Sequence, residues 1–312
     1  MLDAIDSEPF DRPLGLFQVT ASGVAVIIGA GIFVLMGAAT ERAGALVWLS
    51  FIIAALLSAL TAFSYMELSS MFPRASAEHE FTRQVFPRWI AGTVGWIMAV
   101  ALIVATATVA LGFSQYVREF VSIDHRITAI SLVFFMGVVS YLGMERAAWV
   151  IVGLGTIEIG SLVVVGLSGL GYIGEVGLTS GRLGGVLSGA ALVFFAFIGF
   201  DEVITLSEET QNPAKNIPRA LMLALGISTL LYVLVAISAV SVLGVSDLAS
   251  SERPLAAVMS AVWGGHAGRL MSVAAIVSTS STVLLVITAA SRMLYGVRSE
   301  EHTSELQSRQ YL

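Results

Sequence analysis

The sequence predicts an all-α integral membrane protein, and three observations support this class. Apolar residues make up 56% of the 312 residues, while charged residues make up only 12%. The mean hydropathy is +0.88. The apolar residues also gather in runs of about 20 or more, the length at which a helix crosses the hydrocarbon of a bilayer. These runs do not alternate with period two, so they do not resemble the strands of a membrane barrel.

The apolar runs indicate eight spans. We expect them at 16–38, 45–70, 89–117, 127–143, 147–173, 186–207, 219–244 and 268–296. The apolar stretch 254–264 is too short to cross, so we expect an interfacial or outer-loop helix there. Basic residues are more frequent in the loops that are cytoplasmic when the N-terminus is inside. Residues 1–15 are therefore predicted to be a cytoplasmic tail.

Composition argues against several other classes. The chain has no cysteine, which excludes disulfides and thiolate metal sites. Its basic residues are scattered, so no nucleic-acid partner is expected. The sequence lacks the HExxH and GxSxG motifs of metalloproteases and serine hydrolases. An intramembrane enzyme and a passive channel remain the alternatives from other classes, and neither explains the features described next.

The first span carries its weakest helix formers at mid-depth. The stretch VAVIIGAGIFVLMGAA, residues 24–39, has Gly29 and Gly31 on either side of Ala30. In lipid, an opened backbone is tolerated only where it is buried in protein or lines a watery cavity. Close packing of helices through small residues is the alternative explanation. The glycines alone leave both explanations open.

The sixth span is interrupted in a similar way. It reads ALVFFAFIGFDEVITLSEE, with Gly199 in the middle and Asp201 and Glu202 directly after it. A charge inside a span is costly unless it faces a cavity or a partner. Matching interruptions in two halves of a chain indicate the substrate site of an inverted-repeat transporter.

Four stretches resemble the amino acid–polyamine–organocation transporter superfamily. They are GVAVIIGAGIFVLMG, SYMELSSMFPRASAEHEFTRQVFP, FFAFIGFDEVITLSEETQNPAKNIPRAL and ASRMLYGVRS, in this order along the chain. The resemblance implies a LeuT-type inverted-repeat fold over residues 16–297, with a first repeat at about 16–173 and a partial second repeat at about 186–297. It also implies a secondary permease for amino acids or related amines in the plasma membrane. One Lys against fifteen Arg, with abundant Ala, Gly and Val, hints at a GC-rich microbial genome, so we expect the inner membrane of a prokaryote.

The resemblance places the substrate at the two interrupted helices. Amide groups at a helix N-terminus suit a carboxylate, and free carbonyl groups suit an ammonium. We therefore expect the N–H groups of Ala30, Gly31 and Ile32 to bind the carboxylate. The carbonyl groups of Phe195, Ala196 and Ile198 are expected to bind the amine, and the rings of Phe195 and Phe197 are candidate gates. Ile28, Gly29, Gly199 and Asp201 complete the predicted site. Asp201 leaves a polyamine or another organic cation open as the substrate.

Glu158, inside the fifth span, is the candidate coupling residue. An intramembrane carboxylate is a functional hypothesis in its own right, since burial favours its protonated form. In the resembling family, the hydroxyl groups that correspond to Ser280 and Ser281 line a cation site. Three interpretations stay open: a proton carrier, a ligand for Na⁺ and a structural carboxylate. No cofactor or bound metal is expected beyond H⁺ or Na⁺ as the coupling ion.

The end of the chain differs from the rest. Residues 298–312 are charged and polar, and RSEEHTSELQS at 298–308 looks like the translation of a sequencing adapter. Two-fold inverted symmetry would also need two spans beyond the eight. We therefore expect 298–312 to be a non-native tail on a C-terminally truncated permease.

Overall fold

The computed structural model is helical throughout and describes residues 14–71, 77–141, 148–174, 177–181, 183–200, 202–206 and 210–310. Its helices are α1 (Leu16–Ile27), α2 (Gly31–Ala43), η1 (Gly44–Leu46), α3 (Val47–Met71), α4 (Ala77–Val85), α5 (Arg88–Val117), α6 (His125–Tyr141), α7 (Ala148–Ser168), η2 (Leu170–Tyr172), α8 (Leu183–Val193), η3 (Phe194–Phe197), α9 (Glu202–Thr205), α10 (Pro213–Ser250), α11 (Pro254–Trp263) and α12 (Gly265–Gln310). Asp201 and residues 1–13 of the expected tail lie outside the described residues.

Five helical segments are long and apolar enough to cross a membrane. They are Gly31–Leu68, Trp89–Val117, Leu154–Tyr172, Pro213–Ser250 and Gly265–Ser291. Shorter apolar helices, among them Leu16–Ile27 and Leu183–Phe197, lie beside the interruptions in the chain. The all-α membrane class is thus confirmed. The number of eight spans stays a prediction, because the short helices beside the interruptions are individually too short to cross a membrane.

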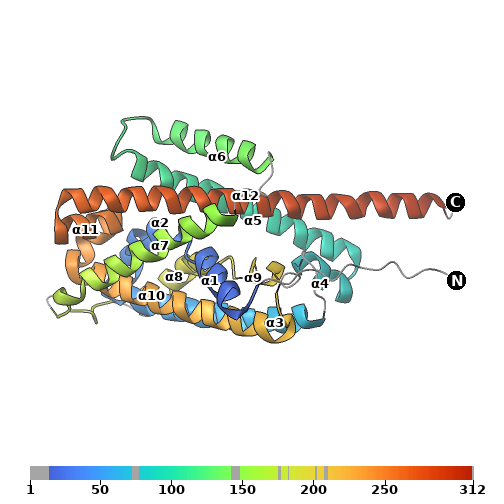
Figure 1. Ribbon diagram of the computed structural model, residues 1–312, viewed down its shortest axis with the longest axis horizontal. Helices are drawn as coiled ribbons and strands as arrows, with labels where there is room; N and C mark the ends of the chain where they lie inside the picture. Colours follow the sequence, from blue (N-terminus) through green and yellow to red (C-terminus); the bar gives the residue numbers. More distant parts are fainter. Residues whose placement is uncertain are drawn as a thin grey trace.

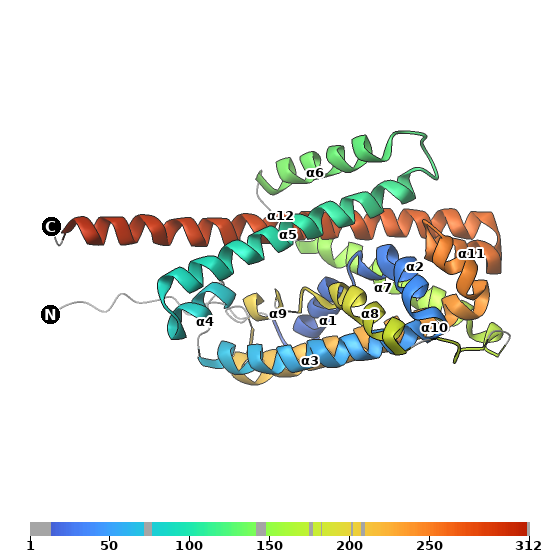
Figure 2. The same ribbon diagram turned by 180° about the vertical axis from the view of Figure 1, so that it is seen from behind.

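Figures 1 and 2 show an elongated bundle in which α12 is the longest element. Helix α5 packs along α12, and α6 packs against both. Helices α3 and α10 lie side by side, with α1 packed on α10 and α2 packed on α8. Helix α7 contacts α1, α10 and α12, so it links the two sides of the bundle.

The buried apolar residues form two clusters. The larger cluster joins α1, α2, α3, α8, α10 and α11. The smaller cluster is built on Ala30, Val109, Ala110, Ala129, Leu132 and Val283, with Phe195 among the partly buried residues packed against it. On the outside of α6, Phe134 is 73% exposed and Ile130 is 68% exposed. Large apolar side chains on an outer surface are suited to lipid rather than water.

Three helix boundaries refine the predicted spans. Helix α10 begins at Pro213 rather than at the expected 219, because a proline is well suited to the first position of a helix. It is kinked at Gly244, where φ is +73°, and the seventh span was predicted to end at this residue. Helix α12 continues to Gln310 without a boundary at 298. The foreign origin of 298–312 remains a prediction, and its last two residues lie outside the described part of the chain.

Candidate functional site

The first predicted break is present. Helix α1 ends at Ile27 and α2 begins at Gly31, with bends and a turn between them. The Ile28 N–H group donates to the carbonyl oxygen of Val24 at 2.8 Å, and the Ala30 carbonyl oxygen accepts from Val34 at 3.0 Å. Regular hydrogen bonding therefore continues on both sides of a short gap. The first turn of α2 leaves the N–H groups of Gly31 and Ile32 without acceptors inside that helix.

The second predicted break is also present. Helix α8 tightens into the 3₁₀ turn η3, and the backbone becomes extended at Ile198, with φ −63° and ψ 139°. Gly199 follows with φ +112°, a conformation that favours glycine because it has no Cβ atom. Helical structure resumes at Glu202 in α9.

The two breaks are in direct contact with each other. A Cβ atom added to Gly31 would lie 2.5 Å from the Cα atom of Ala196. A Cβ atom added to Gly199 would lie 3.1 Å from the Val26 side chain and 3.3 Å from the Val26 carbonyl oxygen. Glycine is therefore needed at both positions so that the two main chains can approach closely. This contact brings the predicted carboxylate-binding and amine-binding segments together.

Tyr232 of α10 joins the two breaks, and our sequence reasoning did not identify it. Its hydroxyl oxygen lies 2.7 Å from the carbonyl oxygen of Ile27 and 2.9 Å from that of Ala196. The side chain is fully buried, and its ring packs against Phe197 and Phe51 at centroid distances of 5.2 and 5.5 Å. A single phenol proton is thus shared between the ends of two helices.

Some of the predicted backbone groups already have internal partners. The Ala30 N–H group donates to Oγ1 of Thr282 on α12 at 2.9 Å. The Phe195 carbonyl oxygen accepts from Ile198 at 3.2 Å, and the Ala196 carbonyl oxygen accepts from Tyr232. Each carbonyl oxygen keeps a second lone pair, so these carbonyl groups can still accept from an ammonium group. The Ala30 N–H group has no second proton to donate.

The predicted side chains differ in their burial. Ile28, Ala30, Ile32, Ala196 and Phe197 are buried, whereas Ile198 is 48% exposed. Phe197 is fixed in the larger cluster by its edge-on contact with Tyr232. Phe195 is only partly buried and lies beside the smaller cluster, so of the two rings it is the one with room to move.

Glu158 and Ser281 are brought together as the sequence suggested, but Ser280 is not. Glu158 is 2% exposed on α7, and its Oε1 atom accepts from the Ser281 hydroxyl group at 2.7 Å. The Ser280 hydroxyl group donates instead to the carbonyl oxygen of Ile276 in its own helix at 2.6 Å. Successive residues of a helix point about 100° apart, so only one of the two serines faces α7.

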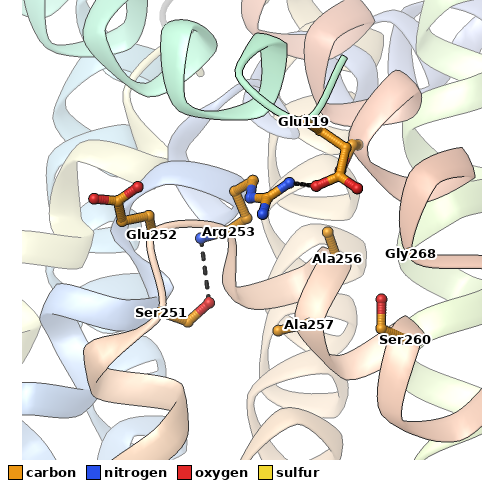
Figure 3. Close-up of a pocket in the computed structure, with 9 residues that line it drawn as sticks. Glu119, Ser251, Glu252, Arg253, Ala256, Ala257, Ser260 and Gly268 are labelled. Atoms are coloured by element: carbon orange, nitrogen blue, oxygen red, sulfur yellow. Dashed lines mark hydrogen bonds and ion pairs between the residues drawn. The ribbon is translucent and has the colours of Figure 1, made fainter. Parts of the chain in front are cut away.

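A separate polar cavity of about 470 Å³ lies between the end of α5, residues 251–253, α11 and the start of α12. Figure 3 shows Arg253 directed toward Glu119, with which it forms an ion pair. A second pair joins Arg118 to Glu252 at 3.6 Å. Among the described residues, none from either break lines this cavity, so it differs from the predicted substrate site.

Comparisons with known proteins agree with the resemblance described above. A family profile described as amino acid permease matches residues 14–300. The branched-chain amino acid permease of Bacillus subtilis is 29% identical over 92% of this chain and 67% of its own length. The methylthioribose transporter of the same organism is 28% identical over 93% of this chain and 68% of its own length.

A plant relative extends the comparison. The mitochondrial cationic amino acid transporter 3 of Arabidopsis thaliana is 28% identical over 90% of this chain and 50% of its own length. The chain thus spans about two thirds of the bacterial relatives and half of the plant relative. Because the family profile matches nearly all of it, the chain belongs to the amino acid permease family.

Proposed function

We propose that this protein is a secondary transporter that carries a neutral amino acid with an apolar side chain across the membrane. The observation that carries the proposal is the direct contact between two helix breaks, Gly31 in one and Ala196 in the other. An α-amino acid presents a carboxylate and an ammonium group side by side. Two adjoining backbone segments, one rich in N–H groups and the other in carbonyl groups, suit these two charges.

The N-terminus of α2 is the proposed carboxylate site. The N–H groups of Gly31 and Ile32 have no acceptor inside the helix, and the helix dipole adds partial positive charge at this end. The proposed amine site is formed by the carbonyl groups of Phe195, Ala196 and Ile198, at the C-terminal end of α8 and η3. In this arrangement the substrate is recognised by main-chain groups, which leaves the choice of substrate to the surrounding side chains.

The surroundings of the breaks support an apolar substrate side chain. Ala30 of the first break belongs to the smaller apolar cluster with Val109 of α5 and Val283 of α12, and Phe195 of the second break packs against this cluster. An apolar wall favours aliphatic side chains, because each buried methylene group contributes about 0.8 kcal/mol. The name of the Bacillus subtilis branched-chain permease is consistent with this class.

Glu158 is the proposed coupling residue. It is buried, and its Oε1 atom accepts a hydrogen bond from Ser281. A proton is our first choice for the coupling ion, since a neutral carboxyl group is tolerated in a buried site. Na⁺ bound by carboxylate and hydroxyl oxygens is the second choice. Exchange of one amino acid for another would need neither ion.

The test is uptake of labelled L-leucine into liposomes that contain the purified chain. We expect accumulation above the external concentration under an imposed pH gradient, which neither a channel nor an enzyme produces. Excess isoleucine should compete, and arginine and putrescine should not. Competition by the two cations would favour the organic-cation alternative. Absence of leucine uptake under pH gradients, Na⁺ gradients and exchange conditions would remove the proposal.

Glu158→Gln separates the coupling mechanisms. We expect this variant to lose accumulation driven by the pH gradient while keeping exchange of leucine for leucine, since glutamine cannot release a proton. Glu41→Gln is the matched control, because Glu41 is an exposed glutamate. If Glu158→Gln retains full accumulation driven by the pH gradient, Glu158 is a structural residue.

A further inference from the structure

The side chain of Thr282 on α12 contacts the opened backbone of the first break. Its Oγ1 atom accepts from the Ala30 N–H group at 2.9 Å and lies 2.9 Å from the Ser278 carbonyl oxygen, to which it donates. The hydroxyl proton therefore points along α12 and a lone pair points at Ala30. A Cβ atom added to Gly29 would lie 2.7 Å from the same Oγ1 atom, so the hydroxyl group fits closely against the opened backbone.

This contact uses the main-chain N–H group that directly precedes the Gly31 and Ile32 amides of the proposed carboxylate site. The Ala30 N–H group was predicted to bind the carboxylate, and Ala30 is completely buried. A buried N–H group without an acceptor is costly, so in the unliganded protein some oxygen atom must accept from it. The Thr282 hydroxyl oxygen accepts it in the same way that a carboxylate oxygen would.

We propose that Thr282 is a positioning residue that stands in for the substrate carboxylate and must be displaced from Ala30 when the substrate binds. The inference rests on the proposed function and extends it. Affinity is then set by a competition between two acceptors for one donor. The threonine hydroxyl group stabilises the empty site and weakens binding by the strength of the hydrogen bond that is exchanged.

The same helical turn also contacts the proposed coupling residue. Ser281, which precedes Thr282, donates to Glu158 Oε1 at 2.7 Å and lies 2.8 Å from the Ser278 carbonyl oxygen. Ser278, Ser281 and Thr282 therefore form one hydrogen-bonded turn that faces Glu158 on one side and Ala30 on the other. Displacing Thr282 from Ala30 disturbs the turn that holds Ser281 on Glu158, which gives the substrate and the coupling ion a physical connection.

Thr282→Val tests the competition, because valine keeps the branched shape and removes the acceptor. We expect the Kd for L-leucine, measured by equilibrium binding to the purified chain, to fall about two- to tenfold, which corresponds to the net strength of one hydrogen bond. Thr282→Ser keeps the hydroxyl group and should bind leucine like the wild type. The matched control is Thr279→Val, since the Thr279 hydroxyl group is buried on the same helix but bonds only to the carbonyl groups of Ala275 and Ile276.

Thermal unfolding provides a second readout. Without leucine, Thr282→Val should unfold at a lower temperature than the wild type, and saturating leucine should raise its Tm by more than it raises that of the wild type. If Thr282→Val does not fold, Thr282→Cys replaces it, because sulfur is a weak acceptor and the same tightening is expected on a smaller scale.

The outcomes separate the inference from the function on which it rests. Unchanged or weaker leucine binding by Thr282→Val, with wild-type binding by Thr279→Val, overturns the role of Thr282 and leaves the proposed function standing. Equal tightening in both variants also overturns it, because the effect would then follow from loss of any hydroxyl group on α12. A wild-type chain that binds no leucine removes the proposed substrate and the inference together.

Discussion

Removing the hydroxyl group of Tyr232 should loosen the junction between the two helix breaks. Tyr232→Phe keeps the ring, and with it the packing on Phe51 and Phe197. It removes the proton that the carbonyl oxygens of Ile27 and Ala196 share. The Ile27 carbonyl group ends α1, so no N–H group four residues later in that helix can replace the lost donor.

Tyr232→Phe should lower the free energy of unfolding by about 1–3 kcal/mol, which is the penalty for leaving a buried acceptor unsatisfied. Tyr116→Phe is the matched control, since its buried hydroxyl group donates to the carbonyl oxygen of Phe33 at 2.7 Å. That carbonyl group lies inside α2, where the helix itself supplies a donor, so we expect a loss of at most about 1 kcal/mol. The assay is thermal unfolding of both purified variants in the same detergent. An equal or smaller destabilisation of Tyr232→Phe would refute the reasoning.

Three further predictions follow from named contacts. The Asp124 carboxylate accepts hydrogen bonds from the N–H groups of Arg126 and Ile127 in the first turn of α6, and these bonds lower its pKa. The ionised carboxylate therefore stabilises the start of α6 fully above the unfolded pKa of about 4. This stabilisation is lost as the pH falls through the lower pKa of the folded state. The protection factors of the first-turn amides of α6 should accordingly fall as the pH drops through the folded pKa of Asp124, and in Asp124→Ala at pH 7, and unchanged protection factors would contradict this. Arg253→Gln removes the ion pair with Glu119 and should lower Tm more at low salt than at high salt, whereas a loss independent of salt would indicate packing instead. Gly31→Ala should lower the free energy of unfolding by about 1–3 kcal/mol, because the new Cβ atom would meet the main chain of Ala196. Gly92→Ala, with open space around Gly92, should leave stability unchanged or raise it. Equal effects of the two substitutions would show that the breaks do not touch.

The breaks could be predicted because both carry local signals. Gly29 and Gly31 are weak helix formers at mid-span, and Gly199 is followed by charge at a depth where charge is costly. These signals depend on the bilayer and on the preferences of single residues, so they can be read without knowing which helices are neighbours. The interruptions observed at residues 28–30 and 198–200 follow directly from them.

The partners of the breaks could not be predicted, because they come from distant parts of the chain. Tyr232 is 205 residues from Ile27, and Thr282 is 252 residues from Ala30. A hydroxyl group on an apolar span indicates a buried hydrogen bond but does not identify its partner. The sequence named both Ser280 and Ser281 for a related reason. The rotation of α12 about its axis decides which serine faces Glu158, and this rotation depends on packing against α5 and α7.

The measurement that tests the central claim most directly is the distance from a bound substrate carboxylate to the glycine amides of the first break. Solid-state NMR of the reconstituted chain, with carboxyl-¹³C leucine bound and all glycines labelled with ¹⁵N, reports this distance by dipolar dephasing. If Gly31 donates to the carboxylate, the carbon and nitrogen atoms lie about 4 Å apart and the leucine signal is dephased. A bound leucine whose carboxyl carbon shows no dephasing from any glycine nitrogen would contradict the account.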